Sequence, residues 1–415
     1  MPRGELLSKA VLLVGGLLLS ATLWASPPGE GSAPVPTVHG LSLYDSPELP
    51  EDFAYFPHVN PQAPKGGSIT HTAVGGSFDS TNPFIIRGTP ATGISQIYDT
   101  LMESNPNEPF SLYGLLARGV RLDPEREWIE FDLHEQARFQ DGEPVTAYDV
   151  VFTFDLLREQ GNPFYASYYA GVEKVTALSE HQVRFEFNDT QSRELPLIVA
   201  QMPILPRHYW EPRDFTAPTL AAHPGSGPYR ISEVDPGRRI VYQRDDNYWG
   251  KDLPVNVGRY NIDRITYEYY RDRDIAWEAF KAGLTDFRID ARAATWAIGY
   301  DFPAYRQGQV KRITVPDVNP SMMQAFVFNL RREKFQDPRV REALSLTFDF
   351  PWLNTNIFYD TYYRTESFFQ NSEMEAVGLP TEEELALLEP FRDELLASHR
   401  SERLFTDPLP IEHPT

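Results

Sequence analysis

The stretch "GSGPYRISEVDPGRRIVYQRDDNYWG", residues 225–250, contains two alternating runs joined by a tight turn. In "YRISEV" (229–234), large apolar residues alternate with polar ones, as in a half-buried strand. In "DPG" (235–237), proline presets φ and glycine tolerates a positive φ. "RRIVYQR" (238–244) predicts the return strand. The stretch therefore predicts a β-hairpin within a mixed sheet.

The composition is that of a folded protein with two or three domains. The chain has 415 residues, of which 41% are hydrophobic and 13% aromatic, and a chain of this length exceeds one ordinary core. Its 38 basic and 59 acidic residues give a net charge of −21. Such a charge disfavours binding to nucleic acid, because like charges repel. The absence of cysteine excludes disulfides, thiolate nucleophiles and a lipidated cysteine.

The N-terminus has the pattern of an export signal. Two cations, Arg3 and Lys9, precede the apolar run 10–25, and a Pro/Gly/Ser-rich stretch follows. The run is shorter than the roughly 20 residues of a membrane-spanning helix, which is the alternative interpretation. We therefore predict a signal peptide cleaved near Ala25 and a linker over 26–38. The mature protein is expected in the periplasm, and it is not expected to be a lipoprotein.

The rest of the chain interleaves strands and single helices. Strands are predicted within 66–76, 126–137, 182–187, 262–270 and 323–330, and again after Gly283. Helix starts are predicted at the capping box Thr146/Asp149, at Asp337–Pro338 and at the capping box Thr381/Glu384. The second of these helices is expected to bury Val340, Leu344 and Phe348. The pattern indicates an α/β or α+β fold with mixed sheets.

No catalytic or metal-binding motif is evident. The nine histidines form no His-x-x-x-His pair, and neither a phosphate-binding loop nor a G-x-S-x-G motif occurs. Acidic residues are so numerous that pairs arise by chance, and nothing singles out two of them as a glycosidase pair. We predict no cofactor, no metal and no catalytic residue. Three classes stay open at this point: a solute-binding protein, an exported hydrolase of peptides or glycans with an unrecognised carboxylate site, and a scaffolding protein.

Three long blocks resemble one known family. They are the opening stretch 225–250, "FDLHEQARFQDGEPVTAYDVVFTFDLL" (131–157) and "FVFNLRREKFQDPRVREALSLTFDF" (326–350). Together they resemble the extracellular solute-binding proteins of peptide-type ABC importers, the oligopeptide- and dipeptide-binding group. Segments 39–67 and 366–380 are most similar to the branch associated with uptake of microcin C and related peptides.

The resemblance implies a two-lobed periplasmic binding protein of mixed α/β fold. It implies a discontinuous first domain (39–83 plus 216–316), an inserted second domain (84–215) and a third domain (317–415). Family members continue beyond "FTDPLPIEHPT" (405–415), so we expect this third domain to be incomplete and the chain to be unstable or to bind poorly. The opening hairpin would rebuild the first domain's sheet, with Tyr248 and Trp249 in the core.

The implied function is capture of an extended oligopeptide between the lobes, without catalysis. The protein would be a monomer that delivers the peptide to an inner-membrane ABC permease and, through it, to its ATPase. The peptide main chain would be held as an added strand. Each candidate ligand-binding residue also has a structural alternative, as an interdomain loop, a packed aromatic or a core residue. The candidates are Arg87, Gly88, Thr89, Tyr165, Met323 and Phe326.

Overall fold

The computed structural model describes residues 35–44, 46–188, 192–315, 320–372 and 374–392. The predicted signal peptide, its cleavage near Ala25 and most of the predicted linker lie outside these residues. Val38, the last residue of the predicted linker, forms an antiparallel bridge with Val120. Among the described residues, no helix is both long enough and apolar enough to cross a bilayer.

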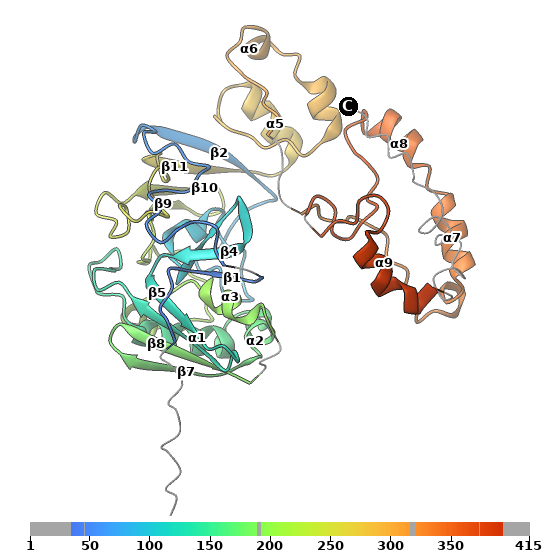
Figure 1. The fold of residues 1–415 in the computed structure, drawn as a ribbon. Helices are drawn as coiled ribbons and strands as arrows, with labels where there is room; N and C mark the ends of the chain where they lie inside the picture. The colour runs from blue at the N-terminus through green and yellow to red at the C-terminus, as the bar shows by residue number, and fades with distance from the viewer. Residues whose placement is uncertain (1–34, 45, 189–191, 316–319, 373, 393–415) are drawn as a thin grey trace, which may run out of the picture. The chain divides into compact units, whose positions relative to one another are not determined.

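The hairpin predicted from 225–250 is confirmed and forms one side of a mixed sheet (Figure 1). Gly237 has φ 71° in its turn, a conformation that glycine adopts without strain. The hairpin strand β10 pairs antiparallel with β11, and β11 pairs parallel with β2. The sheet order is β2 (Ser68–Val74), β11 (Arg264–Tyr270), β10 (Arg239–Arg244) and β9 (Tyr229–Asp235).

Two further sheets are antiparallel. The larger has the order β5 (Ala117–Leu122), β6 (Trp128–Leu133), β8 (Gln182–Phe187) and β7 (Val172–Ser179). The smaller has the order β1 (Gly40–Ser42), β4 (Glu108–Gly114) and β3 (Met102–Asn105). In β6 the alternation seen in the sequence faces the core, because Ile129, Phe131 and Leu133 are fully buried.

The helices are short, and local signals fix several of their starts. α1 begins after Thr146, which forms the predicted capping box with Asp149. α9 begins after Thr381, whose hydroxyl oxygen accepts from the Glu384 N–H at 3.2 Å. The α-helices are α1 (Ala147–Gln160), α2 (Pro163–Tyr168), α3 (Leu195–Ala200), α4 (Arg207–Trp210), α5 (Arg273–Lys281), α6 (Pro303–Arg306), α7 (Pro338–Leu346), α8 (Phe350–Ile357) and α9 (Glu382–Leu388). Single turns of other helix types are η1 (Ile94–Ile97), η2 (Thr295–Gly299), η3 (Glu333–Phe335) and η4 (Glu389–Phe391).

The two glycines that open the hairpin stretch allow its backbone to touch η1. A Cβ on Gly225 would lie 1.8 Å from the Ile97 carbonyl oxygen, well inside van der Waals contact. The Gly227 N–H donates to that same oxygen at 2.9 Å. Only glycine fits at Gly225 without displacing the backbone of the facing segment.

The polar atoms of the same stretch converge on one buried carboxylate, Asp99, which is 2% exposed. The Tyr248 hydroxyl and the Trp249 indole N–H each donate to it at 2.9 Å. The Asp99 N–H donates to the Ser226 hydroxyl at 3.1 Å. Burial raises the pKa of Asp99 to about 8, against the opposing effect of these donors. Tyr248 is buried, as predicted, and Trp249 packs at the edge of the core. This part of the hairpin stretch is therefore structural.

Three expectations about the later part of the chain are wrong. The strand expected after Gly283 is reduced to a single bridge between His71 and Phe287. Residues 323–330 form no strand, because no described segment pairs with them. α7 starts at Pro338 after Asp337, as predicted, but its apolar stripe is uncovered. Val340, Leu344 and Phe348 are 38%, 42% and 44% exposed.

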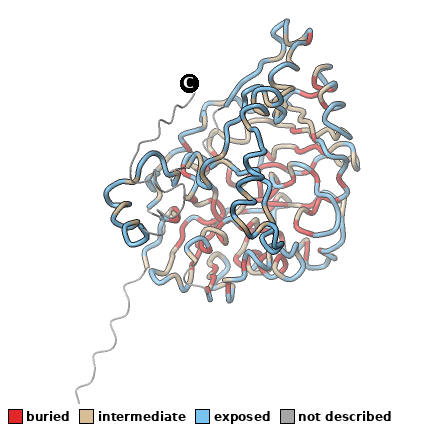
Figure 2. The backbone as a smooth tube through the Cα atoms, turned by 90° about the vertical axis from the view of Figure 1, so that its right-hand side faces the viewer, coloured by how far each residue is buried: buried red, intermediate tan, exposed pale blue. Residues whose placement is uncertain are grey.

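Burial is unevenly distributed along the chain (Figure 2). The buried residues lie within 40–302, in the sheets, the helices and the loops that connect them, and none lies in the described part of 320–392. Amphipathic periodicity indicates which face of a helix is apolar, but a neighbouring segment must cover that face to bury it. The candidate site residues that precede position 320 therefore lie on the well-packed part of the protein.

Candidate functional site

The predicted loop Arg87–Thr89 is exposed and is tied to the chain ten residues before it. The Asp79 and Ser80 N–H groups donate to the Thr89 carbonyl oxygen at 3.0 and 3.2 Å, and the Asp79 carboxylate accepts from the Thr89 N–H. Gly88 has φ 91°, and a Cβ there would lie 2.9 Å from the Asp79 carboxylate. The loop backbone is thus fixed while the Arg87 side chain faces solvent.

Tyr165, on α2, lies beside the start of this loop. Its ring is half-buried and contacts Phe84 and Tyr169, with ring centroids 6.2 and 6.1 Å apart. The Asn162 N–H donates to the Phe84 carbonyl oxygen at 2.7 Å. The structure therefore brings Tyr165 next to the residue three positions before Arg87. Contact of Tyr165 or of the loop Arg87–Thr89 with a ligand stays a prediction.

Met323 and Phe326 lie in a segment that has neither helix nor strand. Met323 is 43% exposed and Phe326 is 91% exposed. They are not core residues in the described structure, which was the structural alternative. Their predicted role in the ligand site stays a prediction.

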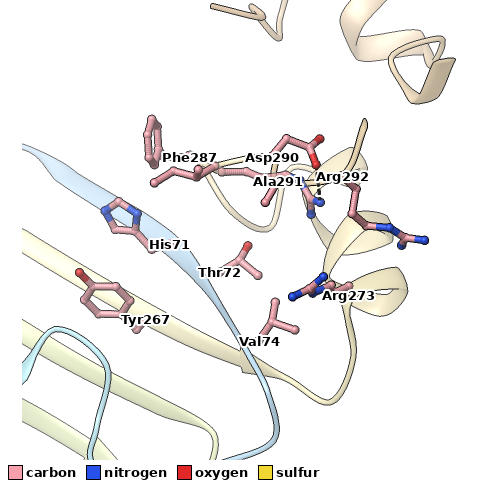
Figure 3. A pocket seen from close by; sticks show the side chains of 11 residues that line it. His71, Thr72, Val74, Tyr267, Arg273, Phe287, Asp290, Ala291 and Arg292 are labelled. Carbon is pink, nitrogen blue, oxygen red and sulfur yellow. Dashed lines mark hydrogen bonds and ion pairs between the residues drawn. The ribbon is translucent and has the colours of Figure 1, made fainter. Parts of the chain in front are cut away.

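The structure contains a pocket that the sequence did not predict. Its volume is about 420 Å³, within the usual range for small-ligand sites. It lies where β2 and β11 meet the start of α5 and the segment 287–292 (Figure 3). The lining side chains are His71, Thr72, Val74, Tyr267, Arg273, Phe287, Arg288, Ile289, Asp290, Ala291 and Arg292.

One wall of the pocket is the outer edge of β2. The start of this edge is covered, because the Asp286 N–H donates to the Thr70 carbonyl oxygen at 2.9 Å and the Thr70 N–H donates to the Asp286 carboxylate at 2.8 Å. Pairing stops at the His71–Phe287 bridge. Backbone groups of alternate residues point to the same side of a strand, so those of Thr72 and Val74 face this edge. A parallel bridge at His71 engages the Thr70 carbonyl and the Thr72 N–H, so among the described residues the open groups of this edge begin at the Thr72 carbonyl and continue at Val74.

A second wall is aromatic. The His71 ring stacks on Tyr267, with centroids 5.2 Å apart and planes 18° apart, and meets Phe287 edge-on at 5.4 Å. Burial lowers the pKa of His71, so the ring is neutral at pH 7. The Tyr267 hydroxyl also accepts a hydrogen bond from the Gln96 side chain at 3.4 Å. Tyr267 thereby connects the pocket to the chain just after the predicted loop.

The third wall is basic. Arg288 is nine-tenths buried, pairs with Asp290 at 3.2 Å and lies over the Trp277 ring at 4.9 Å. Arg292 pairs with Asp274 at 2.8 Å at the surface. Arginine forks and an open strand edge bind carboxylates and peptide main chains. Within the described residues, no group of three potential metal-ligating side chains occurs.

The sequence missed this pocket because its parts are far apart along the chain. The only local signal was the presence of four arginines between positions 271 and 292, and their spacing matches no known motif. A half-buried histidine on an edge strand, such as His71, has no distinctive spacing either. The loop Arg87–Thr89 and Tyr165 were predicted from the family resemblance. No sequence pattern that would also have located the pocket was used for them.

Comparisons with known proteins agree on a single family. The pattern described as "Bacterial extracellular solute-binding proteins, family 5 Middle" matches residues 111–395. The chain is 43% identical over 365 residues to the "Probable peptide-binding protein YejA" of Agrobacterium fabrum, covering 86% of this chain and 59% of that protein. It is also 43% identical over 396 residues to the "Peptidoglycan-binding protein YepA" of the same organism, covering 91% and 63%.

Solved structures share the fold at low sequence identity. The oligopeptide-binding protein AppA of Bacillus subtilis, in complex with a nonapeptide, aligns with a TM-score of 0.56 and 18% identity over 80% of this chain and 64% of that chain. A periplasmic oligopeptide-binding protein of Thermotoga maritima with bound mannohexaose aligns with a TM-score of 0.51 and 21% identity over 71% and 53%. The predicted fold class, mixed α/β, is confirmed, and the chain shares this fold with these two oligopeptide-binding proteins.

The first curated relatives are longer than this chain, which spans 62–64% of the length of the Brucella binding proteins that it matches. The matched pattern nevertheless covers more than half of the chain, and the relatives match nearly all of it. The chain therefore belongs to the bacterial extracellular solute-binding proteins of family 5.

Proposed function

We propose that this protein is the substrate-binding component of a peptide-type ABC importer. It captures extended oligopeptides, with peptides related to microcin C as one class of cargo. It then delivers them to an inner-membrane permease, whose ATPase drives uptake. Family membership supports this proposal, as does the name of the Agrobacterium relative, which is described as a peptide-binding protein.

The observation that carries the proposal is the open edge of β2 beside the pocket. An extended peptide that lay along Thr72–Val74 would find backbone donors and acceptors ready for strand addition. The His71 and Tyr267 rings offer a flat apolar wall for its side chains. Main-chain pairing of this kind gives affinity without reading the peptide sequence.

Several finer features belong to the same proposal. The domains would be 39–83 plus 216–316, 84–215 and 317–415, and the peptide would lie between two lobes. Arg87, Gly88, Thr89, Tyr165, Met323 and Phe326 would line the site. The protein would act as a monomer.

We also propose that the protein is a binder and not an enzyme. The competing interpretation is an exported hydrolase with an unrecognised carboxylate site. The matched family consists of solute-binding proteins, which favours binding over turnover. Repeated incubation with peptide and glycan libraries should return the compounds unchanged. Turnover that survives repurification and is abolished by a single carboxylate substitution would favour the hydrolase.

Export to the periplasm is part of the proposal as well. N-terminal sequencing of the protein from a fractionated host is expected to begin near Ser26 in the soluble periplasmic fraction. An intact Met1 in the membrane fraction would contradict cleavage.

The open edge can be tested by removing its backbone donor. Val74→Pro deletes one N–H on the outer side of β2, where proline is tolerated better than inside a sheet. Val74→Thr is the matched control, because it changes the side chain and keeps the donor. Calorimetry with tri- to pentapeptides should show binding to the wild type and to Val74→Thr, and at least about tenfold weaker binding to Val74→Pro. Equal affinities in two folded variants would show that this edge does not hold the peptide.

A further inference from the structure

The pocket beside β2 carries an excess of positive charge in a strongly acidic protein. Its lining includes three arginines, Arg273, Arg288 and Arg292, and one carboxylate, Asp290. The whole chain has a net charge of −21. His71 adds no charge at pH 7, because burial lowers its pKa. The pocket lining is therefore positively charged, whereas the chain as a whole is negatively charged.

The nearest carboxylates each have donors of their own. Asp290, whose side chain is 2% exposed, accepts from Arg288 at 3.2 Å and from the Tyr300 hydroxyl at 3.2 Å. Asp286 accepts from the Thr70 N–H at 2.8 Å. Asp272 caps α5, accepting from the N–H groups of residues 274 and 275 at 3.0 and 2.9 Å. The three carboxylates therefore hold the pocket walls in place through these contacts. None of them pairs with Arg273.

Arg273 is the first residue of α5 and is exposed to solvent. It forms no ion pair or hydrogen bond with any side chain in the described part of the chain. A cation at this end of a helix is also unfavourable with respect to the helix dipole. On the same wall, Arg292 pairs with Asp274, but the two side chains are 47% and 85% exposed. An exposed ion pair of this kind adds little to stability. The Arg292 guanidinium can therefore exchange Asp274 for a carboxylate of a ligand.

We propose that the pocket selects peptides with an acidic side chain, whose carboxylate is bound by Arg273 together with Arg292. This inference rests on the proposed peptide-binding function and adds a ligand preference to it. The peptide main chain would lie along Thr72–Val74, and the carboxylate would reach the basic wall beyond the His71 ring. Arg288 would stay paired with Asp290 and shape the pocket without binding the ligand.

The test compares two peptides that differ only in charge, Ala-Glu-Ala and Ala-Gln-Ala, by calorimetry on the full chain. A charge-assisted contact in a partly enclosed site should make the wild type bind the Glu peptide about tenfold more tightly. Arg273→Gln should reduce this preference to less than about twofold, through a loss of affinity for the Glu peptide. Arg271→Gln is the matched control, since Arg271 is an exposed arginine two residues away and outside the lining.

Added salt should shrink the preference in the wild type and in Arg271→Gln, because the contact is close to the surface. If the wild type binds both peptides equally, or if Arg273→Gln keeps the full preference, the proposed selectivity is overturned and the peptide-binding function stands. If neither peptide binds to the folded wild type, the peptide-binding function fails and this inference fails with it.

Discussion

The wild-type protein should lose stability as the pH rises because of Asp99. Replacing Asp99 by asparagine should abolish this loss. Asp99 is the buried carboxylate on which Tyr248 and Trp249 converge. Burial raises its pKa from 3.8 to about 8. The protonated acid is therefore the favoured form in the folded protein, and asparagine has nearly its shape and polarity.

The sign follows from proton binding. Between pH 4 and 8 the folded state holds a proton on Asp99 that the unfolded state has released. The stabilisation from that proton is fully present below pH 4 and is lost as the pH rises through 8. The free energy of unfolding of the wild type, relative to Asp99→Asn, should thus fall by up to about 1.4 kcal/mol per pH unit in this window. His223, whose pKa is lowered to about 4 by burial, titrates in both proteins and cancels.

The assay is urea unfolding of both proteins at pH 5, 6, 7 and 8, followed by far-ultraviolet circular dichroism. Asp246→Asn is the control, since Asp246 is 86% exposed, and its difference from the wild type should not change with pH. A difference between wild type and Asp99→Asn that is constant from pH 5 to 8 would show that Asp99 is ionised in the folded protein. The two donors to its carboxylate, Tyr248 and Trp249, would then outweigh its burial.

Gly225→Ala should destabilise the protein by about 3 kcal/mol or more, because the new methyl group meets a backbone carbonyl at 1.8 Å. Gly299→Ala, which meets side-chain atoms of Thr295 at 3.2 Å and Trp277 at 3.4 Å and no backbone, should stay within about 1 kcal/mol by the same chemical denaturation. Glu130→Ala should cost about 1–3 kcal/mol, because Arg121 loses a charged acceptor at 2.9 Å and keeps only one, Asp132. A loss below 1 kcal/mol would contradict that reasoning. Thr146→Ala should lower the melting temperature through the loss of about 1 kcal/mol of capping at α1, whereas an unchanged melt would show that the cap contributes nothing. Tyr165→Ala should weaken peptide binding by about 1–3 kcal/mol without unfolding the protein, and an unchanged dissociation constant would remove Tyr165 from the proposed site.

Features that depend on a few neighbouring residues could be predicted from the sequence. The turn at Asp235–Gly237 and the capping boxes at Thr146 and Thr381 are each formed within one turn of chain, so their residue types determine them. The alternation in β6 also sufficed to orient its core face.

Features that depend on a partner segment could not be predicted in the same way. The stripe on α7 has the correct period, but no described segment covers it. Asp99 has no distinctive neighbours in the sequence, and its role depends on donors about 150 residues away. The pocket likewise joins β2 to residues some 200 positions later.

The proposed function requires that this chain binds intact peptides, whereas an incomplete third domain would make binding weak. Native mass spectrometry of the purified folded protein, mixed with a defined library of tri- to nonapeptides, measures this binding. We expect one-to-one complexes with peptides that are released unchanged on denaturation, and enrichment of acidic peptides among them. Complexes that contain no peptide, or recovery of cleaved peptides, would contradict the proposed function.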